Sequence, residues 1–275
     1  MVLLKLSLLA SILSFISAIL LCWACLHLEA RFRLVAFISF SCAMTYPYRV
    51  HLMSVALGSA RDWSMRNGIV QIVYVLSSLG STWLYTGLAF NILHTYLALT
   101  RVHRYDSKRM SLLFIILSVC IGLGNCIVRI VFLSEGLQKN HVNYINLLAL
   151  LAICISGAPV LVYLALRTWR ARRASHALPS FSTIDARSAF DQWMVLRFLL
   201  IALILLVGSC TNLMVLTSEM VDRRFQPIEL GSAPRAEDLV NRYGAAAWTG
   251  TLLLFVYCTG KEVGTFFTRF FLYRK

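Results

Sequence analysis

The sequence predicts an all-α integral membrane protein, a seven-transmembrane helix bundle with its N-terminus outside and its C-terminus in the cytoplasm. The first observation behind this prediction is composition: 59% of the 275 residues are hydrophobic and only 14% are charged. A soluble domain carries about 25% charged residues, so this composition is typical of membrane proteins. The other two observations are the long apolar runs and the uneven placement of arginine and lysine.

Seven apolar runs are each long enough to cross a hydrocarbon core about 30 Å thick, because a helix rises about 1.5 Å per residue. In lipid the backbone must satisfy its own hydrogen bonds, so we expect helices and not open strands. The runs occupy nearly the whole chain, which predicts a single domain, residues 1–275. The expected helices span residues 4–26, 34–58, 69–100, 111–134, 143–166, 195–220 and 245–268.

The first run starts close to Met1 and could be a signal peptide. Its apolar core, residues 6–25, is longer than the usual ~7–15 residues, and no clear small-residue cleavage site follows. We therefore expect an uncleaved first helix. In the second run the segment TYPYRVH, residues 45–51, interrupts the apolar pattern, and Pro47 predicts a kink that opens the helix.

The third run carries a stripe of polar residues at roughly helical spacing. The stripe consists of Ser77, Ser81, Tyr85, Asn91, His94 and Thr95. Polar side chains inside membrane helices mostly form interhelical hydrogen bonds, which is the role we expect for Asn91 and His94, while Ser81 and Tyr85 are candidates for a ligand pocket. All eight cysteines lie inside the apolar runs, so we expect them to pack between helices and to form no disulfide framework.

The placement of arginine and lysine sets the orientation. Fifteen of the 26 fall in the first, third and fifth connections and in the C-terminal tail, whereas eight fall on the opposite side and three within the runs. Cytoplasmic connections carry the excess of Lys and Arg, so the N-terminus is expected outside. The excess of positive charge is then explained by contact with the inner membrane surface and with acidic partners. It gives no reason to expect nucleic-acid binding.

Two arginines inside the runs are the leading candidates for ligand binding. Arg49 and Arg129 should lie about 22 Å and 27 Å above the cytoplasmic ends of their helices, and an arginine within a membrane costs about 2.5–3.5 kcal/mol on insertion scales. Two guanidinium groups at similar height suit a carboxylate or phosphate. With Tyr48 and Tyr85 they form the predicted ligand-binding set. The alternative is that Arg49 bonds to backbone carbonyls or tyrosine, while Arg129 reaches the outer headgroups.

No enzyme and no cofactor are predicted. The chain has no HExxH pair, no GxSxG segment and no span rich in carboxylates. Lys261 lies toward the inner end of the last run, and the third run has no Asp or Glu to serve as counter-ion. A retinal Schiff base is therefore not expected.

Seven helices with this orientation, and the longest inner connection between the fifth and sixth, are the architecture of a G-protein-coupled receptor. In that architecture the inner gap between helices three, five and six accepts a heterotrimeric G-protein α-subunit, and the ligand is an extracellular peptide or small molecule. The predicted G-protein-facing residues are Arg101, Arg104, Arg172 and Arg173. The plasma membrane is the expected location.

Three stretches resemble the fungal pheromone receptors of the a-factor class. They are SVCIGLGNCIVRI after the basic pair Lys108 and Arg109, the basic connection of residues 167–198, and the last run WTGTLLLFVYCTGKEVGTFFTRFF. The resemblance implies a receptor for a lipidated peptide pheromone. The third run, SLGSTWLYTGLAFNILHTYLAL, is similar to cyclic-AMP receptors and nutrient-sensing relatives, which keeps a nutrient or cyclic-nucleotide receptor open. An organic-anion transporter, using Arg49 and Arg129 for its substrate, is the alternative from another class.

Overall fold

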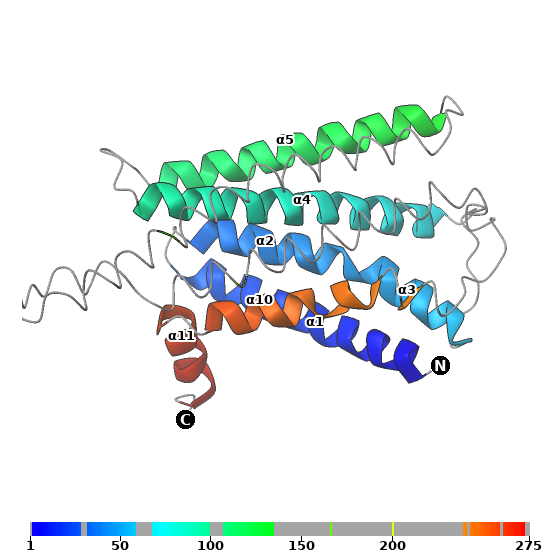
Figure 1. The fold of residues 1–275 in the computed structure, drawn as a ribbon, viewed down its shortest axis with the longest axis horizontal. Coiled ribbons are helices and arrows are strands. Elements are labelled where there is room, and N and C mark those ends of the chain that lie inside the picture. The colour runs from blue at the N-terminus through cyan, green and yellow to red at the C-terminus, as the bar shows by residue number, and fades with distance from the viewer. Residues whose placement is uncertain are drawn as a thin grey trace, which may run out of the picture.

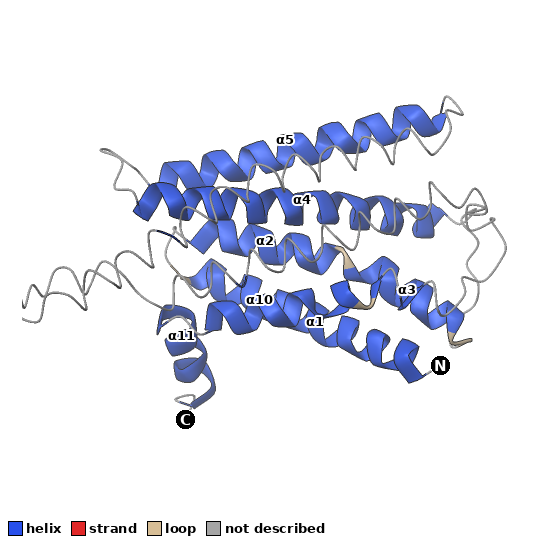
Figure 2. Ribbon diagram, viewed as in Figure 1, coloured by secondary structure: helices blue, strands red, loops and turns tan. Residues whose placement is uncertain are grey.

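The computed structural model describes residues 2–28, 32–58, 68–99, 107–134, 166, 200, 239–240, 243–258 and 261–272. Within these ranges every regular element is helical (Figure 2), which confirms the all-α prediction for the part that the structure describes. The expected helices 143–166 and 195–220 lie almost entirely outside these ranges.

The helices are long and most lie side by side (Figure 1). Their bounds are α1 (Val2–His27), α2 (Arg33–Met44), α3 (Tyr46–Ala56), α4 (Gly68–Leu99), α5 (Ser107–Ser134), the 3₁₀-helix η2 (Ala245–Trp248), α10 (Thr249–Cys258) and α11 (Lys261–Leu272). In Figure 1 the order across the bundle is α5, α4, α2 and α1, with α10 packed against α1.

Successive long helices run in opposite directions. Ser77 near the start of α4 lies against Thr45, and Asn125 near the end of α5 lies against Thr82. The segment leading into η2 returns to the beginning of α1, where Leu4, Met53 and Leu239 form a small cluster. The end of α5, the start of α1 and the start of η2 therefore lie at one end of the bundle, and α11 lies at the other (Figure 1).

The second predicted helix is divided at Thr45. Pro47 has no N–H, and its ring crowds the carbonyl of residue 43. The helical hydrogen bonding changes there: Thr45 donates its backbone N–H to Cys42 O, three residues back, at 3.0 Å, and its hydroxyl to the same oxygen at 2.8 Å. The break in the helix thus falls two residues before the proline. α3 then ends at Ala56, and Gly58, two residues further on, has a φ of 69°, the left-handed conformation common after a helix.

The last predicted helix, 245–268, is also divided. α10 ends at Cys258, and α11 runs across the direction of the bundle (Figure 1). Gly264 of α11 sits close to the carbonyl oxygen of Cys258; a side-chain Cβ there would lie 2.8 Å from that oxygen. The glycine therefore allows the sharp change of direction. Sequence composition missed this break because both halves are rich in apolar residues.

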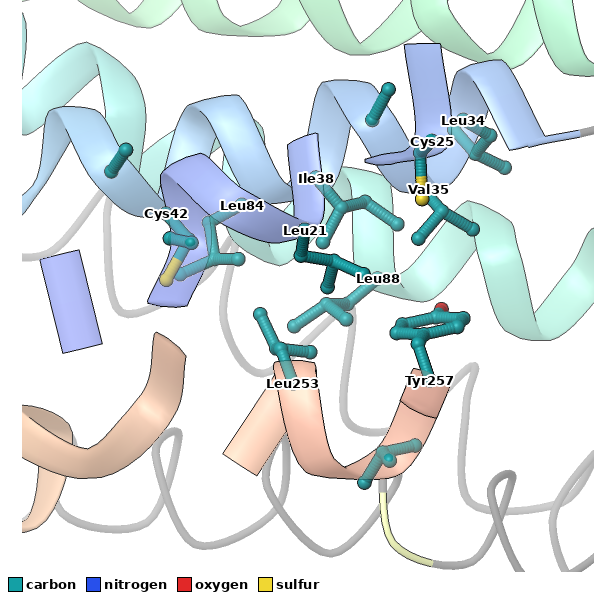
Figure 3. Close-up of a cluster of buried hydrophobic side chains, with 14 of the residues drawn as sticks. Leu21, Cys25, Leu34, Val35, Ile38, Cys42, Leu84, Leu88, Leu253 and Tyr257 are labelled. Atoms are coloured by element: carbon teal, nitrogen blue, oxygen red, sulfur yellow. The ribbon is translucent and has the colours of Figure 1, made fainter. Parts of the chain in front are cut away.

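One apolar core joins most of the described helices, and Figure 3 shows the part of it to which α1, α2, α4 and α10 contribute. It combines Leu21 and Cys25 of α1, Leu34, Val35, Ile38 and Cys42 of α2, Leu84 and Leu88 of α4, and Leu253 and Tyr257 of α10. Small residues let the backbones approach closely, as is usual between membrane helices. A Cβ at Gly80 of α4 would lie 2.9 Å from Ser41 O of α2, and one at Gly250 of α10 would collide with Ser14 O of α1.

The surface of the described bundle is apolar and parts of its interior are polar. On α1, Leu6, Leu9 and Leu13 are exposed, whereas Ser11 and Ser14 are completely buried. Such a distribution is the opposite of a soluble protein's. Three helical segments, Val2–His27, Ile72–His94 and Lys108–Ile127, are long and apolar enough to cross a membrane. The protein is therefore embedded in a membrane.

Candidate functional site

The predicted ligand segment, residues 45–51, lies where α3 meets η2 and the start of α10. Pro47 occupies the first turn of α3, a position at which its missing N–H costs no helical hydrogen bond. The helix start then places Tyr46 and Arg49, three residues apart, on the side that faces η2. A local signal, the proline, thus positions both side chains.

Tyr46 is the fully buried residue of this region, with 0% of its surface exposed. Its Oη accepts the backbone N–H of Gly250 at 2.9 Å and donates to Ala246 O at 3.5 Å. The Cys42 thiol lies 3.8 Å away. The phenol therefore bonds to backbone groups at the change from 3₁₀- to α-helix, where Ala246 O also accepts the Thr249 backbone N–H, and it ties α3 to α10.

Arg49 is half-buried and reaches the same backbone carbonyl. Its Nη1 donates to Ala246 O at 3.3 Å, and its guanidinium carbon lies 5.5 Å from the Tyr46 ring centre and 5.6 Å from that of Tyr243. The Thr249 hydroxyl donates to the same oxygen at 3.0 Å. A cation between two aromatic faces is stabilised electrostatically. We refer to Tyr46, Arg49, Tyr243 and Ala246 as the Arg49 joint.

The geometry matches the alternative expectation for Arg49, a bond to a backbone carbonyl together with tyrosine. Its predicted part in ligand binding stays a prediction. Tyr243 was missed by sequence reasoning because its connection with Arg49 spans almost 200 residues and no local spacing signals it. The one available signal was that a buried arginine needs partners, and aromatic rings near the start of the last helix could supply them.

The other predicted ligand residues lie elsewhere. The Tyr48 ring packs edge-on against Tyr74 of α4, with ring centres 5.1 Å apart. Tyr85 packs against the main core, eleven residues beyond Tyr74 and therefore about 16 Å further along α4. Arg129 belongs to the last turns of α5, and its side chain is outside the described ones. The described residues thus form no single pocket from this set.

The predicted G-protein-facing residues Arg101, Arg104, Arg172 and Arg173 lie outside the described ranges. The ends that flank the first two are described: α4 ends at Leu99 and α5 begins at Ser107, at the end of the bundle opposite the Arg49 joint. Exposed basic residues gather at this end, which we call the basic end. They are Arg33 of α2, Lys108 and Arg109 of α5, and Arg269 of α11.

Polar pairs between the helices confirm the expected interhelical hydrogen bonds. Asn91 of α4 donates to the Tyr257 hydroxyl of α10 at 2.7 Å, and His94 lies 3.0 Å from the Ser111 hydroxyl of α5. The Ser14 and Thr251 hydroxyls, 3.0 Å apart, join α1 to α10. Six of the eight cysteines are described, and all six are free thiols. In the described ranges no group of three or more metal-binding side chains could hold a metal ion.

Comparison with known proteins gives no further assignment. No known protein family matches the chain, and no curated protein matches its sequence significantly.

Proposed function

We propose that the protein is a seven-helix receptor that transmits the binding of an extracellular ligand to a heterotrimeric G protein. The observation that carries the proposal is the basic end, where exposed Arg33 begins α2 and exposed Lys108 and Arg109 lie in the first turn of α5. α4 ends there at Leu99, shortly before Arg101 and Arg104 in the sequence. A positively charged inner face suits both the cytoplasmic side of a membrane and an acidic partner surface.

The number of helices is supported by where the described ones begin and end. α1, α2 with α3, α4 and α5 account for four crossings, which return the chain to the end where α1 starts. Leu239, ahead of η2 and α10 in the chain, lies at this same end, against Leu4 and Met53. We therefore expect the intervening residues to cross an even number of times. The proposal takes the apolar runs 143–166 and 195–220 as two crossings, for a total of seven.

The Arg49 joint favours an apolar ligand over a small anion. The Arg49 guanidinium is engaged by Ala246 O and two tyrosine rings, so an anion would have to compete with these contacts. A lipidated peptide needs no pair of free arginines. This supports a pheromone receptor-like protein of fungal type over an organic-anion transporter.

The proposed mechanism is a shift between two conformations. A ligand that contacts α3 or α10 also acts on the other helix, because Tyr46 bonds to Gly250 of α10 and Arg49 to Ala246 of η2, which leads directly into α10. If the ligand binds one arrangement more tightly, that arrangement becomes more populated. In the active arrangement the sixth helix moves away from the third and fifth at the basic end, and the gap accepts the G-protein α-subunit.

The test is nucleotide exchange on purified G-protein α-subunits with the reconstituted protein and candidate peptide or small-molecule ligands. We expect exchange that depends on ligand and is lost in Arg172→Ala/Arg173→Ala. The matched control is Arg223→Ala/Arg224→Ala, which removes an adjacent pair of arginines from the side predicted to be extracellular. An active lipopeptide would indicate a pheromone receptor, and an active nucleotide or nutrient a receptor of the alternative type. No exchange, together with anion uptake that Arg49→Ala abolishes, would indicate a transporter.

A further inference from the structure

α11 separates its side chains by polarity more clearly than the other described helices. Its helical positions place Val263, Phe266 and Phe267 on one face, and Thr265 and Thr268 on the other. Arg269 borders the polar face and is exposed, as are Thr265 and Thr268. α1 and α5, by contrast, expose large apolar residues to their surroundings. The sequence of α11 therefore suits a boundary between lipid and water.

The direction of α11 agrees with this pattern. α11 lies across the bundle axis while α1, α4 and α5 run along it (Figure 1). Because these three helices are long and apolar enough to cross a membrane, a helix that runs across them is expected to lie along the membrane surface. Its position beyond Cys258 puts it at the basic end.

Aromatic contacts fix α11 at this position. Phe266 packs against Trp23 of α1 with ring centres 5.3 Å apart, and it stacks with His27 at 6.2 Å. Val263 is only 2% exposed. One edge of the apolar face therefore rests on the end of α1. In membrane proteins, aromatic residues such as Trp mark the level of the headgroups.

We propose that α11 lies in the membrane surface and binds anionic phospholipids, with its apolar face resting on the end of the bundle and Arg269 among the headgroups. Amphipathic helices with basic polar faces bind membranes through apolar burial and attraction to anionic lipid. Arg33, Lys108 and Arg109 at the same end add to the attraction. The inference rests on the orientation in the proposed function, with the basic end at the cytoplasmic leaflet, where anionic lipids gather.

The test is hydrogen exchange of the α11 amides in the full chain, reconstituted in phosphatidylcholine membranes with and without phosphatidylserine. We expect about fivefold slower exchange with phosphatidylserine for each basic group engaged, and loss of the difference at high salt. Arg269→Gln should reduce the effect. The control, Lys5→Gln, removes the same charge from exposed Lys5 at the opposite end of the bundle, and should leave α11 unchanged.

Equal exchange of α11 in both membranes would overturn the inference, as would an equal effect of Lys5→Gln and Arg269→Gln. Amides of α1 and α5 serve as an internal control, because their protection shows that the bundle is folded in each variant. Lipid-independent exchange in α11 would leave ligand-dependent activation of the G protein untouched, so failure of this inference and failure of the proposed function are distinguishable.

Discussion

An arginine among apolar residues is the feature at the residue scale that the structure explains most fully. The guanidinium of Arg49 contacts one backbone carbonyl and two tyrosine rings. The carbonyl of Ala246 and the ring of Tyr243 come from the far end of the sequence. The cost of placing a guanidinium in a membrane is offset by contacts that join α3 to η2. Residues of this kind are usually read as ligand contacts, yet here a stabilising role is visible.

Arg49→Met tests the stabilising role. The substitution keeps a long flexible side chain but removes the donor and the charge, so we expect a loss of about 1–2 kcal/mol in the free energy of unfolding. Arg49→Lys should lose less stability than Arg49→Met, because it keeps the positive charge but replaces the planar guanidinium with an ammonium. Unfolding in detergent mixtures measures the change. Arg33→Met, at an exposed site at the other end, should stay within about 0.5 kcal/mol. Unchanged stability in Arg49→Met would show that the joint contributes nothing to the fold.

The hydrogen bond between Asn91 and Tyr257 gives a second prediction. Both side chains are 8% exposed, and Asn91 Nδ2 donates to the Tyr257 hydroxyl at 2.7 Å. Interhelical hydrogen bonds in membrane proteins average about 0.6 kcal/mol and reach about 1.7. We expect a coupling free energy in this range from the cycle of Asn91→Ala, Tyr257→Phe and the double variant. Additive effects of the two substitutions would contradict the bond.

At the scale of the element, the crossing of α1 and α10 depends on glycine. In Gly250→Ala the new methyl group would meet the carbonyl oxygen of Ser14, a backbone atom that cannot rotate away. The helices would have to separate, and the Ser14 and Thr251 hydroxyls, 3.0 Å apart, would lose contact. We expect a loss of about 1–3 kcal/mol in the free energy of unfolding.

Gly124→Ala is the matched control for that substitution. Gly124 also lies within a membrane helix, and a Cβ there meets nothing within 4 Å. Alanine favours the helix over glycine by about 0.8–1.0 kcal/mol, so we expect unchanged or increased stability. If both alanine variants lose stability equally, close packing at Gly250 is not the cause.

The elements also show what sequence can and cannot predict. Apolar runs longer than about 20 residues predicted the positions of α1, α4 and α5 well, because hydrophobic length is a local property. Pro47 signalled the break, although the break itself lies at Thr45, two residues before the proline. The break after Cys258 was not predicted, because the turn depends on Gly264 approaching a carbonyl and on α11 resting against Trp23.

The candidate site was predictable only in part, for a related reason. The segment with Tyr46 and Arg49 stands out locally because polar residues interrupt an apolar run. Its partners Tyr243, Ala246 and Gly250 are about 200 residues away, and no spacing within either segment indicates that they meet. For Asn91 the sequence predicted the type of interaction, and the fold supplied the partner Tyr257.

At the scale of the whole molecule, the arrangement of the described helices predicts which connections share a side of the membrane. α1 starts at the same end as the connection of residues 59–67, since α3 ends and α4 begins there. α4 ends and α5 begins at the other end, where α11 also lies. By the positive-inside rule we expect this end on the cytoplasmic side.

Short tags at these four places test the arrangement. We expect tags at the N-terminus and within 59–67 to bind antibody on intact cells, and tags within 100–106 and at the C-terminus to bind only after permeabilisation. The tag pairs carry separate information. Opposite accessibility of the N-terminal and 59–67 tags would contradict the described helix directions. Shared accessibility of the two termini would mean an odd number of crossings between α5 and η2, which seven helices do not allow. Complete reversal of all four tags would preserve the bundle and place the basic end outside, where a G protein cannot reach it.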